Sequence, residues 1–295
     1  MPATPAKEPV PKRLRAYLAN AVLSAPLKLA LALPYGLRVR LMGGLMGRVL
    51  APPLGYRKRV RANLDLVWPD LPEGEKQRLC RQVPENFGRT LIEIYSGTAL
   101  KAHLADTHPE GPGLPALQKA HAEGRPVILV SGHFGNHDTV RATVSREFSP
   151  VGALFRPLDN AYFNAHWEDA IRGVAEPAFP RGRKGLAQMV KYLRGGGIIA
   201  LLVDQHVGDG ADLTFFGHPA KTTLSAAEMA LKYNALVLPV FGVRQPDGLS
   251  LKALIQEEIP HSTAEEMAQA MNDALEAMVR QHPEQWFWVH RRWKS

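Results

Sequence analysis

One stretch of the chain decides the fold, Pro126 to Asp138, which reads PVILVSGHFGNHD. Its first five residues are wholly apolar, as expected of a strand buried on both faces of a mostly parallel sheet. The strand leads into the glycine-flanked His133, and Asp138 follows five positions later. Open α/β sheets place their functional sites at the carboxyl ends of strands. This stretch therefore predicts both a parallel sheet and the location of a site.

The rest of the chain alternates between strand and helix. Further candidate strands cover residues 151–155, 198–203 and 236–241. Pro239 favours an edge position or a bulge for the last of these strands. A helix over residues 263–280 begins with a capping box, with Ser262 as N-cap and Glu265 three residues on. The pattern predicts an α/β fold, an open and mostly parallel sheet flanked by helices.

Positive charge is concentrated at the N-terminus. The first 63 residues contain twelve Lys and Arg against one acid, Glu8, while the whole chain has a net charge of +8. These cations flank the apolar stretch 17–36, which has the length of a membrane-spanning helix but is interrupted by Pro26, Lys28 and Pro34. The pattern favours a helix lying on an anionic lipid surface, with a full span or a buried core helix as alternatives. It does not indicate a nucleic-acid partner.

We therefore divide the chain into three parts. Residues 1–12 are expected to be a disordered lead-in, 13–50 an N-terminal helical membrane-associating segment, and 51–295 a single α/β domain. The single cysteine, Cys80, excludes a disulfide framework and a Cys-based zinc site. The sequence has neither a dinucleotide-binding motif nor a P-loop, so no cofactor is expected.

His133 and Asp138 are the candidate catalytic pair. On a strand-end turn and the first turn of the following helix, their side chains can meet. A carboxylate bonded to one ring nitrogen fixes the tautomer of a histidine and leaves the other nitrogen to take a proton. His133 is thus the candidate general base and Asp138 its orienting partner. Backbone N–H groups near Gly135, or Arg156, are candidate donors to a developing oxyanion.

The sequence also leaves other functional classes open. His133 and His137 have the i, i+4 spacing of metal ligands, and either Asp138 or Asp204 with His206 would complete the site of a metal-dependent hydrolase. Gly135 between the two histidines argues against one helical face presenting both. A serine hydrolase is disfavoured because the sequence has no G-x-S-x-G elbow. A non-catalytic lipid-binding protein is a further alternative.

The H-x-x-x-x-D spacing within SGHFGNHD resembles the signature of the lysophospholipid-acyltransferase-like superfamily. The sequence is most similar to the lipid A biosynthesis lauroyl/myristoyl acyltransferase family of Gram-negative bacteria, from about residue 15 to the C-terminus. Further segments that match this family in the same order are Arg61–Leu64 with Trp68-Pro69, Asn86–Thr90, Phe155–Asn160, Asp204-Gln205, Phe215–Gly217, Ala220 with Thr222-Thr223, and Pro283–Lys294.

This resemblance implies transfer of a fatty acyl chain from acyl carrier protein or acyl-CoA to a lipid A precursor at the cytoplasmic face of the inner membrane. Another glycolipid, a lysophospholipid or a lipoamino acid is an alternative acceptor. The family commonly has Trp-Glu where His137-Asp138 stand here. The resemblance implies His133 and Asp138 as catalytic residues, and as substrate-binding residues Arg156, Asn160, Asp204, Arg291 and Arg292.

Overall fold

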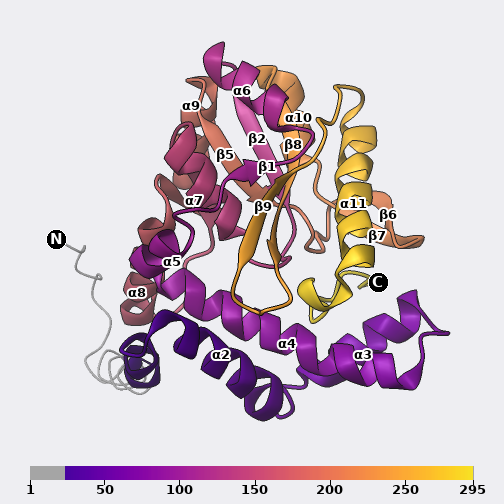
Figure 1. Ribbon diagram of the computed structural model, residues 1–295. Helices are drawn as coiled ribbons and strands as arrows, with labels where there is room; N and C mark the ends of the chain where they lie inside the picture. Colours follow the sequence, from indigo (N-terminus) through magenta and orange to yellow (C-terminus); the bar gives the residue numbers. More distant parts are fainter. Residues whose placement is uncertain (1–23, 295) are drawn as a thin grey trace, which may run out of the picture.

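The computed structural model describes residues 24–294, and its centre is a seven-stranded sheet with the order β1-β9-β8-β2-β5-β3-β4 (Figure 1). All neighbouring strands are parallel except β8 and β9, which confirms the expected α/β class. The strands of this sheet are β1 (Pro109–Glu110), β2 (Val127–Ser131), β3 (Val151–Phe155), β4 (Ala178–Pro180), β5 (Ile198–Leu202), β8 (Leu236–Arg244) and β9 (Leu251–Ile255). A separate antiparallel hairpin consists of β6 (Ala211–Phe215) and β7 (His218–Thr222).

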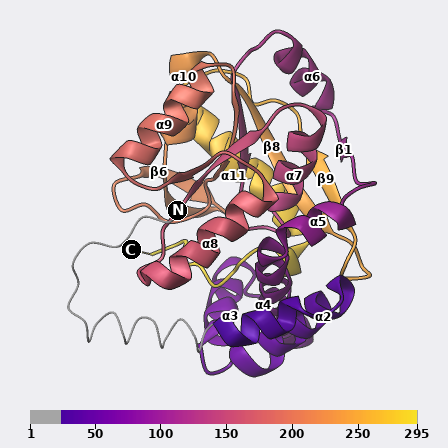
Figure 2. The same cartoon turned by 90° about the vertical axis from the view of Figure 1, so that its left-hand side faces the viewer.

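The helices cover both faces of the sheet and form a layer beyond one end of it (Figure 2). Those of the first half are α2 (Tyr35–Leu45), the π-helix η1 (Met46–Leu50), α3 (Tyr56–Val67), α4 (Glu73–Tyr95), α5 (Gly97–His103) and α6 (Leu114–Ala122). Those of the second half are α7 (Asp138–Glu147), α8 (Ala161–Val174), α9 (Arg183–Arg194), α10 (Ser225–Tyr233), α11 (Ala264–Gln281) and the 3-10 turn η2 (Pro283–Gln285).

The apolar run of β2 is explained by packing on both faces of the sheet. Ile128 and Val130 lie in a cluster with residues of α9, α10 and α11. Val127 and Leu129, which point the other way, lie in a cluster with residues of α6 and α7. All four side chains are buried, so helices cover β2 on either side and the strand has no polar face.

Two local predictions need correction. Pro239 is not in an edge strand, because β8 lies between β9 and β2. It is the last residue of β8 that pairs with β2, and pairing with β9 begins at Val240, so the proline stands where the ladder changes partner. The capping box of α11 is one residue later than expected, with Thr263 as N-cap and Glu266 as its partner.

The N-terminal helices form a layer on α4. Figure 1 shows α2 along the side of α4 that faces away from the sheet, and α3 beside the right-hand end of α4. Two glycines allow the close packing. A Cβ on Gly47 of η1 would lie 2.2 Å from Glu85 of α4, and a Cβ on Gly88 of α4 would lie 2.5 Å from Met46 of η1. Within residues 24–294, no helix is both long and apolar enough to cross a membrane. The expected lead-in, 1–12, and the start of the expected membrane-associating segment, 13–23, lie outside the described residues.

Candidate active site

Two neighbouring strands bring His133 and Asp204 together. β2 and β5 are parallel, and their register pairs Ser131 with Leu202. His133 and Asp204 each stand two residues beyond these paired positions, at the same edge of the sheet. Strand pairing therefore joins two residues that are 71 positions apart in the chain. Arg156 follows β3, the next strand beyond β5, at this same edge.

The Asp204 carboxylate accepts three hydrogen bonds. Nδ1 of His133 lies 2.8 Å from Oδ1, and Oδ2 accepts from the backbone N–H of His133 at 2.8 Å and from Nε1 of Trp286 at 2.9 Å. Burial of Asp204 opposes its charge, but the contacts with His133 outweigh burial and hold the pKa of the carboxyl far below its ordinary value. Because an ionised carboxylate can only accept, Nδ1 of His133 carries the proton and Nε2 keeps a lone pair. The His133 side chain is 28% exposed, which leaves its ring accessible.

The loop that carries His133 is fixed from beneath. Gly135 has φ 50°, and a Cβ there would lie 2.0 Å from the carbonyl oxygen of Gly242 in β8, so the position requires glycine. Nδ2 of Asn136 donates to Oε2 of Glu93 in α4 at 2.8 Å. Glu93 in turn forms a buried, bidentate pair with Arg244, with N–O distances of 2.8 and 2.6 Å. α4 and β8 together therefore position the loop.

The sequence led us to expect that Asp138 orients the His133 ring, but Asp138 bonds to a different residue. Its Oδ1 accepts from Nη1 of Arg141 at 2.6 Å, and both side chains are buried. Burial opposes the charge of Asp138, but Arg141 keeps the pKa of the carboxyl below its ordinary value. Arg141 also donates to the carbonyl of Ala175 at 2.8 Å. Through Arg141, Asp138 thus stabilises the packing of α7 against the end of α8. The bonding position at Nδ1 of His133 is occupied by Asp204 instead.

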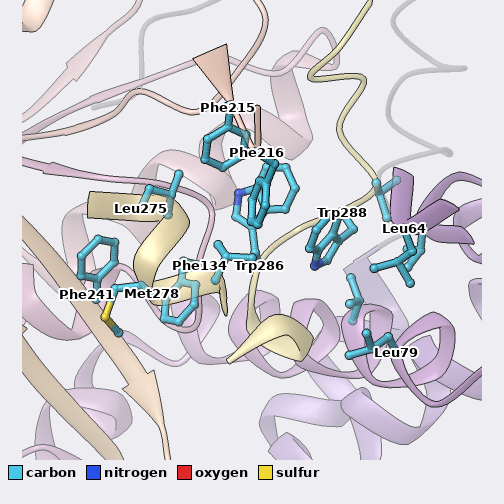
Figure 3. Packing of buried hydrophobic residues seen from close by; sticks show 14 of the residues in the cluster. Leu64, Leu79, Phe134, Phe215, Phe216, Phe241, Leu275, Met278, Trp286 and Trp288 are labelled. Carbon is cyan, nitrogen blue, oxygen red and sulfur yellow. The ribbon is translucent and has the colours of Figure 1, made fainter. Parts of the chain in front are cut away.

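The C-terminal tail completes the site. Trp286 and Trp288 are fully buried, and Figure 3 shows them among Phe216, Leu64 and Leu79. The two tryptophans of this aromatic and basic segment are therefore core residues. The backbone N–H of Phe287 donates to the carbonyl oxygen of His133 at 2.9 Å, which attaches the tail to the loop.

The tail also places a second histidine against His133. The ring centroids of His133 and His290 are 4.6 Å apart, at an interplanar angle of 76°. Burial lowers the pKa of His290 from 6.5 to about 4, so the ring is neutral near neutral pH. A neutral neighbour does not repel an imidazolium at His133. Sequence reasoning missed this contact, although His290 lies within the Pro283–Lys294 segment that matched the family.

The other candidate residues lie in different environments. Arg156 and Arg291 are exposed. Asn160 caps α8, its Oδ1 accepting from the backbone N–H groups of Tyr162 and Phe163 at 3.0 and 3.2 Å. These positions place two cations on the surface and Asn160 in a helix cap.

Arg292 was expected to bind substrate, but its side chain is fully buried. Nη1 donates to the carbonyl of Lys221 and Nη2 to Oγ1 of Thr222, both at 2.6 Å. A guanidinium with buried backbone and hydroxyl partners holds the tail against β7. In this structure Arg292 is therefore a packing residue.

The backbone donors of the loop are already used. The N–H groups of His133, Phe134, Gly135 and Asn136 donate, in that order, to Asp204 and to the carbonyl oxygens of Gly132, Gln285 and Gly242. Gly135 is thus a poor candidate for stabilising an oxyanion. Arg156, an exposed cation at the same sheet edge, is the better candidate of the two expected from the sequence.

Three of these side chains form a group that could hold a metal ion. Within residues 24–294, His133, Asp204 and His290 offer ligand atoms that lie within 4.8 Å of one another. The set differs from the His133–His137 pair considered from the sequence, whose ring centroids are 5.9 Å apart. Both oxygens of Asp204 accept hydrogen bonds from His133 and Trp286, and a cation would have to displace these donors. The arrangement therefore fits a proton-transfer network better than a ligand set.

Comparison with known proteins identifies the family to which the chain belongs. The profile of the bacterial lipid A biosynthesis acyltransferase family matches residues 7–295. The chain is 26% identical to lipid A biosynthesis lauroyltransferase of Escherichia coli strain K12, over 90% of this chain and 88% of that protein. It is also 26% identical to the palmitoleoyltransferase of the same strain, over 86% and 84% of the two chains, and 25% identical to its myristoyltransferase, over 81% and 75%. The chain is an acyltransferase that belongs to the bacterial lipid A biosynthesis acyltransferase family.

Proposed function

We propose that this enzyme transfers a fatty acyl chain from an acyl thioester to a hydroxyl of a lipid A precursor, with His133 as general base and Asp204 as its positioning residue. The observation that supports the proposal best is the bond from Nδ1 of His133 to an ionised, buried Asp204. This bond leaves Nε2 of an accessible ring ready to take a proton. The names of the relatives, which are lauroyl-, palmitoleoyl- and myristoyltransferases of lipid A biosynthesis, support the substrate class.

The reaction would proceed by direct transfer. Nε2 of His133 removes the proton of the lipid hydroxyl as the oxygen attacks the thioester carbonyl. Asp204 stabilises the resulting imidazolium, and Arg156 is the proposed donor to the developing oxyanion. Collapse of the tetrahedral intermediate breaks the C–S bond, and His133 returns the proton to the departing thiolate. Arg291, next to His290 in the chain, is proposed to attract the phosphates of the acceptor.

The location proposed for the reaction is the cytoplasmic face of the inner membrane. Leu37, Leu41, Leu45 and Val49 follow one another at four-residue intervals, and all four are exposed on α2 and η1. Such a row on one side of a helix is typical of a segment that lies in a lipid interface. The exposed Arg48 and its basic neighbours would add electrostatic attraction to anionic lipids.

The experiment offers purified enzyme a long-chain acyl thioester, on acyl carrier protein or on CoA, and one of two acceptors. The acceptors are a tetraacylated lipid A precursor and a lysophospholipid, and products are identified by mass spectrometry. Addition of an acyl chain to the lipid A precursor is expected. Transfer to the lysophospholipid alone would refute the substrate, and thioester hydrolysis without transfer would favour a hydrolase. A reaction without acceptor provides the control for hydrolysis.

A further inference from the structure

A basic groove lies between α3 and α4, away from the catalytic residues. It encloses about 590 Å³. No acidic side chain is among the residues that line it, which are Arg57, Lys58 and Arg61 of α3 and Gln77, Cys80 and Arg81 of α4. Four cations around one concave surface make it suitable for an anion.

Two of these cations have acidic neighbours outside the groove. Arg61 forms a bidentate pair with Glu73, with both N–O distances at 2.6 Å. Nε of Arg81 lies 3.9 Å from Oε1 of Glu85, a distance too long for a hydrogen bond. Arg61 is therefore largely neutralised by its partner, whereas Arg81 keeps most of its capacity to bind an anion.

The other two cations are less neutralised. Arg57 donates from Nη2 to the carbonyl of Gly47 at 2.6 Å, while its Nε is buried and has no hydrogen-bond partner among the described residues. Lys58 is exposed and has no carboxylate partner in residues 24–294. Lys58 is therefore available to bind an anion in the groove.

The groove faces a different side of α3 from the catalytic tail. Nδ2 of Asn63, on α3, donates to the carbonyls of Trp288 and His290 at 2.6 and 2.9 Å. Two residues from Arg61, Asn63 points about 200° away around the helix. An anion in the groove would thus be separated from His133 by α3, which argues against the groove as the binding site of the reacting hydroxyl.

The groove lies next to η1, which carries part of the exposed apolar row. The bond from Arg57 to Gly47 joins its rim to η1. Val49, Leu50 and Leu54, in η1 and just after it, are exposed. Apolar side chains beside a cationic hollow match a phospholipid, whose acyl chains and phosphate lie side by side at a bilayer surface.

We propose that this groove binds the phosphate headgroup of an anionic phospholipid and so orients the enzyme on the membrane. The proposal rests on the proposed docking of α2 and η1 in the lipid interface. Lys58 and Arg81 contact the phosphate, and Arg57 lies at the rim of the groove that adjoins η1. The site is accessory to the acyl-transfer site.

The test measures flotation of the full-length protein with phosphatidylcholine vesicles, with and without phosphatidylglycerol. Lys58→Gln and Arg81→Gln are each compared with Arg59→Gln. Arg59 is an exposed cation of α3 that does not line the groove, so the control loses the same charge. Each groove variant is expected to bind phosphatidylglycerol vesicles roughly fivefold more weakly than wild type, a loss of about 1 kcal/mol per cation. The control is expected to change less than about twofold.

Equal losses in all three variants would show diffuse attraction and overturn the proposal. Displacement of the vesicles by inorganic phosphate, at a chloride-matched ionic strength, would identify a free-phosphate site instead. Weaker binding of acyl carrier protein by Lys58→Gln, with vesicle binding unchanged, would identify a protein site. Acyl transfer by the wild-type enzyme is measured in detergent in parallel, so that the acyl-transfer proposal is tested independently of the groove.

Discussion

Replacing Asp204 with Asn separates the proposed role of this carboxylate from its packing. Oδ2 of Asp204 accepts from the backbone N–H of His133 and from Nε1 of Trp286. An amide NH₂ cannot take that position, because it would face two donors. The oxygen of Asn must therefore stand there, and its NH₂ then points at Nδ1 of His133. The imidazole is forced into the tautomer that carries its proton on Nε2, where the base is needed.

The expected loss follows from this tautomer switch. General-base catalysis is worth roughly 10²–10⁴-fold, and the equivalent Asp-to-Asn change in the serine-protease triad costs about 10⁴-fold in kcat. We expect Asp204→Asn to lower kcat by roughly 10²–10⁴-fold. The fold should survive, since both donors at the Oδ2 position keep an acceptor and no unpaired charge is buried.

The assay is the initial rate of acyl transfer per folded molecule, with near-ultraviolet circular dichroism reporting on the Trp286 environment. Asp138→Asn is the matched control, because it makes the same chemical change five residues from His133. Its rate per folded molecule should stay within about threefold of wild type, as expected for a group outside the reaction. Full activity in folded Asp204→Asn, with loss of activity in folded Asp138→Asn, would refute this reasoning and return Asp138 to the orienting role.

Three further predictions follow from the described contacts. Asp138→Asn should destabilise the fold by roughly 3 kcal/mol in urea unfolding, because Arg141 is left buried without its counter-charge; an unchanged midpoint would contradict this. His290 has a pKa lowered to about 4, so from pH 6.5 to about 4 the unfolded chain binds a proton that the folded chain does not. Wild type should lose about 2–3 kcal/mol more stability than His290→Gln over this range, and parallel pH profiles would contradict the burial of this ring. Acyl transfer should continue after exhaustive dialysis against EDTA; loss of activity that zinc restores would favour the His133–Asp204–His290 group as a metal site.

The sheet and the location of the site could be predicted from local sequence. The apolar run of β2 has no polar face because it is buried on both sides, and its carboxyl end lies where α/β sheets place their sites. The glycines around His133 pointed to a tight loop, and Gly135 does adopt a positive φ. These features are determined by residues that are close together in the chain, so they can be predicted from the local sequence.

The partner of His133 could not be predicted, because it depends on which strands become neighbours. Asp138 is close in sequence, but Asp204 reaches the ring through the β2–β5 register. Asp138 follows the loop that carries His133, and Asp204 follows the apolar strand β5. Only the order of the strands in the sheet shows that Asp204 is the one that reaches the ring. The burial of Arg292 was missed for a similar reason: its partners, Lys221 and Thr222, lie on β7, and only the folded hairpin brings them to the C-terminal tail.

The most direct test of the general-base proposal compares wild type with His133→Ala in transfer from a long-chain acyl thioester to a tetraacylated lipid A precursor. The product is quantified by mass spectrometry, and folding of the variant is verified by its thermal transition. Wild type is expected to yield the precursor with one added acyl chain, and folded His133→Ala to form it roughly 10²–10⁴-fold more slowly. Formation of the same product by folded His133→Ala at a rate near that of wild type would contradict the role of His133 as the base.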